Sequence, residues 1–280
     1  MITAHPTDFS QGQFYFGNSR VSGADWIPLQ IPPGAKFLDA LLVGCGGNGG
    51  AGASAAAGTQ RGGGGGGGGG ALASFRLPCA FLPSTVYLSL AGRGAGVTSY
   101  LSAFPDTSSY YYSCNAGGTG GTGTTTAAGA GGGTSSINVG PALVQAFVAT
   151  IANGVSGGAG SLGDALGSTI IGSKGIIQGG AGGSGVTLTS QFGGFCTSNY
   201  GRASPQSYVA GPGNPGIDGF RIMAPYPIFT GACAGGSNNT GTGGNGGNGG
   251  PGCGGGGGGA GVTGGSGGTG GEGFAWVMFS

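Results

Sequence analysis

Residues 243–272 read GGN GGN GGP GCG GGG GGA GVT GGS GGT GGE when they are written in threes. All ten triplets begin with Gly, and eight also carry Gly in the second position. A period of three is the period of the polyproline II helix, which has no internal hydrogen bonds. The tract therefore predicts a bundle of such polyglycine helices, with backbone hydrogen bonds between neighbours and the small third-position side chains facing outward.

The length of this tract requires it to fold back. At 3.1 Å per residue a straight tract would be about 93 Å long, whereas an ordinary strand spans about 20 Å. We therefore expect reversals at residues 251–253 (PGC) and near Val262. Collagen has the same period, but it needs one Gly per triplet with Pro-rich positions between, and only Pro251 supplies that here.

Apolar segments lie between this tract and the other glycine runs at 62–70, 115–133, 157–160 and 179–185. Their alternation or apolar content predicts strands at 26–31, 36–43, 71–77, 85–90 and 274–279, with weaker signals at 186–189 and 220–224. Residues 141–154 predict one helix, because apolar residues recur four apart behind Pro141, although β-branched residues are frequent there. We expect a mostly β fold: a small antiparallel, jelly-roll-like β-sandwich combined with the bundle of polyglycine helices.

The composition excludes several classes of protein. Gly (78) and Pro (14) make up about a third of the 280 residues, as in disordered or collagen-like chains, but only 5% are charged, which is unlike a soluble disordered chain. Eight scattered Lys and Arg form no basic patch, so we expect no nucleic-acid partner. Apolar runs fall far short of the roughly 20 residues of a membrane span, so we expect no membrane insertion, and no signal-peptide pattern is visible.

The residues that usually carry chemistry are scattered. Six Cys lack CxxC spacing and His5 is the single His, so we expect no metal, and thiols rather than disulfides in a chain made in a reducing cytoplasm. The seven Asp and Glu are spread singly, which predicts no acid–base pair. GVSGG at 154–158 matches the nucleophile-elbow string by chance, and GSTIIGSK at 167–174 lacks the P-loop Lys position. We expect no enzymatic activity and no cofactor.

The order of the segments carries further information. A strand, a Pro-Gly turn at 32–34 and a second strand lead into GCGG at 44–47, and the run at 62–70 leads into another strand. GGTSS at 132–136 and GGEGFAWVMF at 270–279 follow. This order resembles the glycine-rich domains of bacteriophage tail fibre and tail tip proteins and, more loosely, the adhesins that cap T-even-type long tail fibres. The resemblance covers roughly residues 26–280.

The resemblance implies a non-enzymatic virion protein, assembled in the host cytoplasm. The leading hypothesis is an exposed tail-tip or fibre adhesin that contacts other virion proteins and a host surface receptor, as a homo-oligomer such as a trimer or as a monomeric cap. Residues 1–25 are expected to be an attachment or lead-in segment before one domain of residues 26–280. The alternatives are a capsid-associated decoration, vertex or fibre-base protein, and an ice-binding or matrix glycine-rich protein.

Aromatic insertions are the candidate contact sites, because Tyr gives a large contact area at low entropic cost and long loops on a rigid scaffold often carry recognition. Alternatively, these rings fill a core that is otherwise short of large side chains. The candidates for receptor or partner contact are Tyr100, Phe104, Tyr110, Tyr111, Tyr112, Tyr200, Arg202, Tyr208 and Tyr226.

Overall fold

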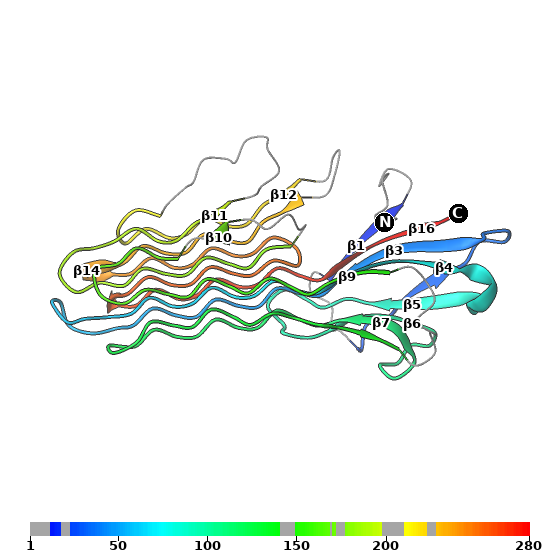
Figure 1. Ribbon diagram of the computed structural model, residues 1–280, viewed down its shortest axis with the longest axis horizontal. Helices are drawn as coiled ribbons and strands as arrows, with labels where there is room; N and C mark the ends of the chain where they lie inside the picture. Colours follow the sequence, from blue (N-terminus) through cyan, green and yellow to red (C-terminus); the bar gives the residue numbers. More distant parts are fainter. Residues whose placement is uncertain are drawn as a thin grey trace.

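The computed structural model describes residues 12–17, 23–140, 149–168, 170–171, 177–197, 210–222 and 228–280. Two antiparallel sheets lie at one end of the molecule, and long glycine-rich segments run from them to the opposite end (Figure 1). The predicted mostly β fold is therefore confirmed. A three-residue 3-10 helix, η1 (Cys79–Phe81), is the one helix in the described part of the chain.

The first sheet has the strand order β1-β16-β3-β4-β9, with every neighbouring pair antiparallel. Its strands are β1 (Gln13–Phe16), β16 (Phe274–Phe279), β3 (Phe37–Val43), β4 (Leu72–Pro78) and β9 (Ala149–Ala152). The C-terminal strand β16 pairs along its whole length with β3, from Phe274 opposite Val43 to Phe279 opposite Leu38. Strand β1 lies within residues 1–25, so part of the expected lead-in segment is paired into this sheet.

The second sheet has the order β2-β5-β6-β7-β8, again antiparallel throughout. Its strands are β2 (Ile27–Gln30), β5 (Thr85–Ser89), β6 (Ser99–Ser102), β7 (Tyr110–Cys114) and β8 (Ile137–Val139). Three two-stranded pairs complete the strands: β10 (Ile170–Ile171) with β11 (Cys196–Thr197), β12 (Arg221–Ile222) with β13 (Ile228–Phe229), and β14 (Asn238–Thr242) with β15 (Gly261–Thr263).

Two hydrophobic clusters hold this end together. The larger one lies between the sheets, where Leu38, Leu42 and Phe75 of the first sheet pack with Val86 and Leu88 of the second. The alternation of apolar and polar residues in 85–89 follows from this burial, since every second side chain points inward. The other cluster covers the outer face of the first sheet: Leu41, Val43, Leu72, Ile177, Phe229, Cys253, Phe274 and Trp276.

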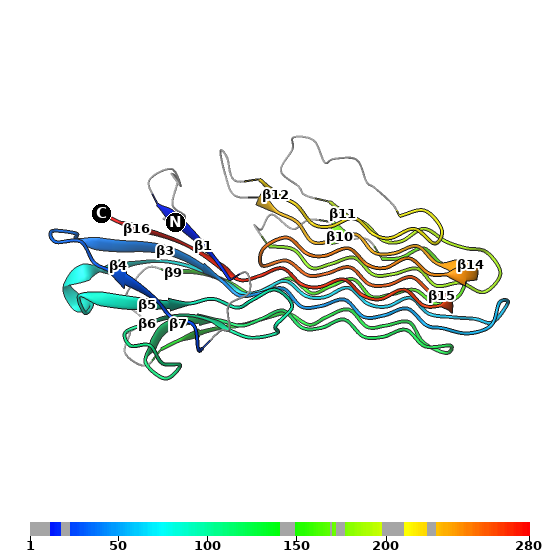
Figure 2. The same ribbon diagram turned by 180° about the vertical axis from the view of Figure 1, so that it is seen from behind.

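The glycine-rich segments form the rest of the molecule and belong to no helix, and few of their residues belong to a strand. They lie side by side as wavy, extended chains in both views (Figures 1 and 2). We call them the glycine array, which comprises residues 44–53, 62–71, 115–136, 153–161, 177–186, 210–219, 230–238 and 243–273. Many of these segments directly follow or precede a strand of the sandwich, so the sheets fix where each segment begins.

Backbone hydrogen bonds join neighbouring segments of the array at every third residue. The N–H groups of residues 44, 47, 50 and 53 donate to the carbonyls of residues 71, 68, 65 and 62, which makes these two segments antiparallel. Residues 46, 49 and 52 donate to residues 271, 268 and 265 on the other side. Each residue therefore bonds to a different neighbour from the residue before it.

Residues 62–71 occupy the centre of the array. All ten N–H groups donate to backbone carbonyls at 2.7 to 3.1 Å, in rotation to the segments 115–124, 155–161 and 252–258. The carbonyls of residues 62–68 accept, in the same rotation, from segments 47–53, 129–132 and 180–183. This segment therefore has six bonded neighbours. A Cβ at residues 62–68 would collide with a neighbouring backbone oxygen, which explains the unbroken run of Gly.

The tract 243–272 reverses where the sequence predicts. Pro251 and Gly252 form a turn, with Gly252 at φ +71°, and Cys253 N–H donates to the Gly250 carbonyl at 2.8 Å. The second reversal includes β15, which contains Val262. The segments on either side pair with one another, for example through Gly256 N–H to the Gly247 carbonyl and Gly268 N–H to the Gly256 carbonyl.

Some predicted elements are wrong. The last part of the predicted helix, residues 149–152, is strand β9, which pairs with β4; residues 141–148 lie outside the described residues. Residues 186–189 form no strand, because Val186 makes only an isolated bridge with Arg61. Of the predicted strand 220–224, residues 221–222 are β12, and residues 223–224 lie outside the described part. The partners of β9 and of Val186 are distant along the chain, and a local sequence pattern does not reveal such partners.

Candidate contact surface

The aromatic insertion at residues 99–114 is a β-hairpin, formed by β6 and β7 with a loop at 103–109. Asp106 organises the loop: its Oδ1 accepts the N–H of Ser108 at 2.8 Å and of Ser109 at 2.7 Å. The Ser108 hydroxyl and these two N–H groups lower the pKa of Asp106, so it is ionised at neutral pH. Phe104 projects from this ordered loop and is 59% exposed.

Half-buried aromatic residues line the outer face of the second sheet. The Tyr100 ring lies between Trp26, at a centroid distance of 6.2 Å, and Tyr110, at 6.0 Å, with interplanar angles of 41° and 59°. Tyr87 is on the same face, since it pairs with Pro28 and Ser102 while its neighbours Val86 and Leu88 point into the core. We call Trp26, Tyr87, Tyr100 and Tyr110 the aromatic strip.

Serine residues lie between these rings at the surface of the sheet. Ser89, Ser102 and Ser113 face outward in register with the strip, yet they are at most 2% exposed. Each hydroxyl has a partner: Ser89 Oγ accepts the Gly23 N–H at 2.8 Å, Ser102 donates to the Asp106 carbonyl, and Ser113 accepts from Asn138 Nδ2. We call Ser89, Ser102 and Ser113 the serine floor, because these small side chains lie close to the sheet and the larger rings extend beyond them.

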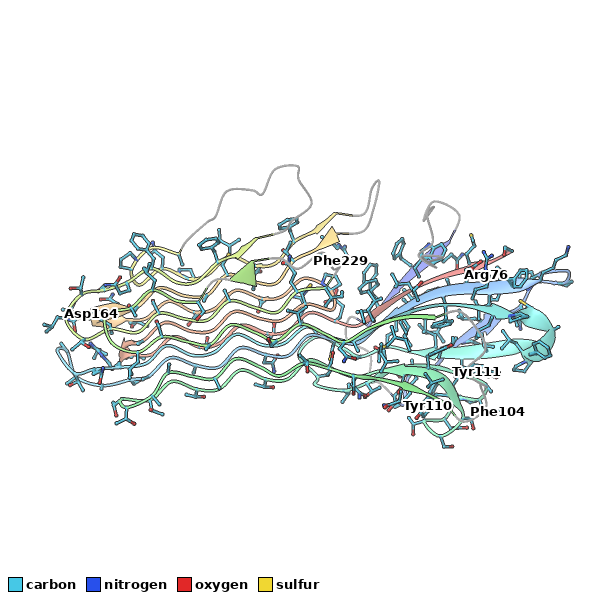
Figure 3. All side chains as sticks on the ribbon, in the orientation of Figure 1. Arg76, Phe104, Tyr110, Tyr111, Asp164 and Phe229 are labelled. Carbon is cyan, nitrogen blue, oxygen red and sulfur yellow. The ribbon has the colours of Figure 1, made fainter. Side chains whose placement is uncertain are left out.

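Tyr111 and Tyr112 are core residues, which corrects the expectation that they contact a receptor. They are 5% and 3% exposed, and the Tyr112 ring stacks on Phe75 of the opposite sheet at 4.2 Å. A β-bulge causes this, because Leu101 pairs with Tyr112 and Ser102 with Tyr110, which leaves Tyr111 unpaired. Burial raises the pKa of both phenols. Figure 3 shows Tyr110 and Phe104 toward the lower edge of the sandwich.

The remaining candidates Tyr200, Arg202, Tyr208 and Tyr226 lie outside the described residues. The structure thus brings Tyr100 and Tyr110 together and places Phe104 on the loop beside them. Trp26 and Tyr87 are not among the contact residues predicted from the sequence. The alternation in residues 85–90 contains the signal for Tyr87, because it places this residue on the face opposite the core positions Val86 and Leu88.

The opposite end of the molecule consists of turns that are held by side chains. Arg61 is fully buried, and its guanidinium donates to the carbonyls of Thr59, Ala55 and Asn239 and to Asn239 Oδ1, at 2.7 to 3.0 Å. Asp164 Oδ1 accepts three consecutive N–H groups, those of residues 187–189 (Figure 3). Leu166 and Leu188, on the same two loops, are 59% and 70% exposed.

Groups for catalysis or metal binding are not gathered in the part of the chain that the structure describes. No cluster of three or more His, Cys, Asp or Glu occurs among those residues. Ion pairs join Arg76 to Asp39 and Arg93 to Glu272 in this part, each between a half-exposed Arg and a nearly buried carboxylate. Cys45, Cys79, Cys114 and Cys253 are free thiols. Among described residues, no helix has the length and hydrophobicity of a membrane span.

Comparison with known proteins gives no identification: no family model and no curated protein matches the chain. The arrangement can nevertheless be described chemically. It is a surface of large aromatic rings on strands that contain no charged residue, with hydroxyl and amide groups at its edges.

Proposed function

We propose that the glycine array is a bundle of polyproline II-type helices and that it serves as a rigid body with very few charged residues. The support is the three-residue rotation of the hydrogen bonds, in which each straight run of residues bonds to the neighbouring runs, outside the turns. The close approach of the segments, which leaves no room for a Cβ at residues 62–68, also supports it. The jelly-roll likeness of the sandwich and a single domain over residues 26–280 belong to the same proposal.

We further propose that the protein is a non-enzymatic structural component of a phage virion, an exposed tail-tip or fibre adhesin that contacts the host surface. The observation that carries this proposal is the fully bonded central segment, residues 62–71, which makes an elongated body with an ordered surface at each end. Such an elongated body suits a component that projects from the surface of a virion. The resemblance in segment order supports the phage assignment.

The second candidate is a capsid-associated decoration, vertex or fibre-base protein. The observation that favours it is β1, which ties the N-terminal segment into the sheet by pairing Gln13–Phe16 with Phe274–Val277. A segment bound this closely to the body suits a protein held firmly among other virion proteins. Gold-labelled antibody against the chain separates the two: label at the tail tip supports the adhesin, and label on the capsid overturns it.

Adsorption tests the contact role directly. Virions that carry Phe104→Ala together with Tyr110→Ala are expected to adsorb to host cells at least about tenfold more slowly, because central aromatic anchors dominate interfaces. Phe81→Ala is the matched control, since Phe81 is 74% exposed on η1 and outside the hairpin. Normal adsorption by the double variant, with normal particle yield, would contradict the assignment of this surface.

A further inference from the structure

We propose that the aromatic strip binds a neutral, hexose-based glycan. This inference rests on the proposed adhesin function and names the class of ligand that the surface would take. It depends on three properties of the outer face of the second sheet: the stacking surfaces, the polar groups at its edges and the distribution of charge.

The stacking surfaces are the rings of Trp26, Tyr100 and Tyr110. Aromatic faces carry partial negative charge, and the C–H-rich face of a pyranose ring is weakly positive, so sugars pack against such rings. The centroid spacings of 6.2 and 6.0 Å are of the order of one pyranose unit. The tilts of 41° and 59° make the strip faceted, which suits a twisted chain of sugars better than a flat crystalline surface.

The serine floor contributes to the shape of this surface. Because Ser89, Ser102 and Ser113 are small and their hydroxyls are already bonded, the larger rings, which contact one another, extend beyond them and form the platforms of this face. Tyr hydroxyls and the Asn138 side chain provide hydrogen-bonding groups beside these platforms. Sugars need this combination of apolar faces and hydrogen-bonding edges.

The near absence of charged side chains on this face favours a neutral ligand. None of the five strands of the second sheet contains a charged residue. Among the described residues, the carboxylates that flank this face in the sequence are Asp25, next to Trp26, and Asp106, in the hairpin loop. Carboxylates accept hydrogen bonds from sugar hydroxyls and repel acidic glycans. The described Lys and Arg residues lie on other elements: Lys36, Arg61, Arg76, Arg93 and Arg221.

The test uses the purified full chain in affinity gels that contain dextran, laminarin or yeast mannan as neutral polymers, and polygalacturonate as the acidic polymer. We expect at least one neutral polymer to retard the chain and to change its Trp fluorescence, and polygalacturonate to have no effect. The fluorescence change is expected from Trp26, because Trp276 is fully buried in the other cluster. It should therefore disappear in Trp26→Phe.

Variants distinguish specific binding by the aromatic strip from nonspecific adsorption of the chain to the polymers. Tyr100→Ala removes the central ring and should weaken retardation by at least about tenfold. Tyr100→Phe keeps the ring and loses one hydroxyl, so it should bind more tightly than Tyr100→Ala, and the control Phe81→Ala should bind as the wild type. If Tyr100→Ala fails to fold by circular dichroism, Tyr110→Ala replaces it. The proposal is overturned if none of the neutral polymers retards the chain, or if folded Tyr100→Ala is retarded as strongly as the wild type.

This experiment is independent of the adhesin assignment because it requires no virion. Glycan binding by a chain that is located on the capsid would retain this inference and reject the adhesin. If the aromatic variants reduce adsorption of virions but the chain binds no glycan, the adhesin assignment is retained and the glycan inference is rejected. That result would point to a protein receptor for the same surface.

Discussion

At the scale of single residues, the number of Gly in each triplet increases with the number of sides on which the segment packs against neighbouring backbone. The central segment 62–70 has Gly at every position, because each of its three edges faces a neighbouring backbone. In the peripheral segment 243–250 the third positions are Asn245 and Asn248, which are exposed and half-buried. Their Oδ1 atoms accept the N–H groups of Ser266 and Thr269 at 2.9 and 3.0 Å, so these side chains replace a missing outer neighbour.

This difference predicts unequal effects of two substitutions in the same segment. Gly246→Val places a side chain against the Gly256 carbonyl and should destabilise the fold by at least about 3 kcal/mol. Asn248→Thr loses the bonds from Thr269 N–H and Oγ1 and should cost about 1 kcal/mol. Denaturant unfolding monitored by circular dichroism measures both free energies. Equal effects would mean that residue 246 is not packed.

At the scale of elements, the strands were predictable where their own sequence contains the pattern. The predicted strands at 26–31, 36–43, 71–77, 85–90 and 274–279 match β2, β3, β4, β5 and β16 to within one or two residues. Strand β9 was missed because its partner, β4, is more than 70 residues away, and short apolar runs with β-branched residues fit either a helix or a strand.

The same reasoning explains which part of the contact surface was predictable. The sequence identified the Tyr-rich insertion, but three consecutive tyrosines give no sign of which rings face the core. That depends on the bulge at Tyr111, which is set by the register between β6 and β7. Trp26 joins Tyr100 only through the arrangement of β2, β5 and β6 in one sheet. Pairing across strands therefore decides the surface.

The bulge makes a prediction for strand β7. Tyr112→Ala removes a ring that stacks on Phe75 in the core and should cost about 3–5 kcal/mol. Tyr110→Ala, on the outer face of the same strand, should cost less than about 1 kcal/mol. Thermal and denaturant unfolding of the two variants provide the comparison. A larger loss for Tyr110→Ala would show that the register of the hairpin differs from this structure.

At the scale of the whole molecule, the sandwich and the glycine array stabilise each other. Residues 44–53 continue from β3, 62–71 lead into β4, and 263–273 lead into β16, so adjacent strands continue as adjacent segments. Ordering so much Gly costs conformational entropy. The cost is offset only if the backbone groups are bonded almost completely, and the hydrophobic clusters of the sandwich provide the fixed starting positions.

Amide hydrogen exchange tests this cooperative view. The ten N–H groups of residues 62–71 are all bonded, to three of the six surrounding segments, so they should exchange only when the whole molecule unfolds. Their protection should exceed that of the turn at residues 55–60 by at least about a thousandfold, given an ordinary global stability of several kcal/mol. Exchange of a ¹⁵N-labelled chain followed by NMR resolves these sites. If residues 62–71 exchange as quickly as the turn, the array opens independently of the sandwich and cannot act as a rigid body.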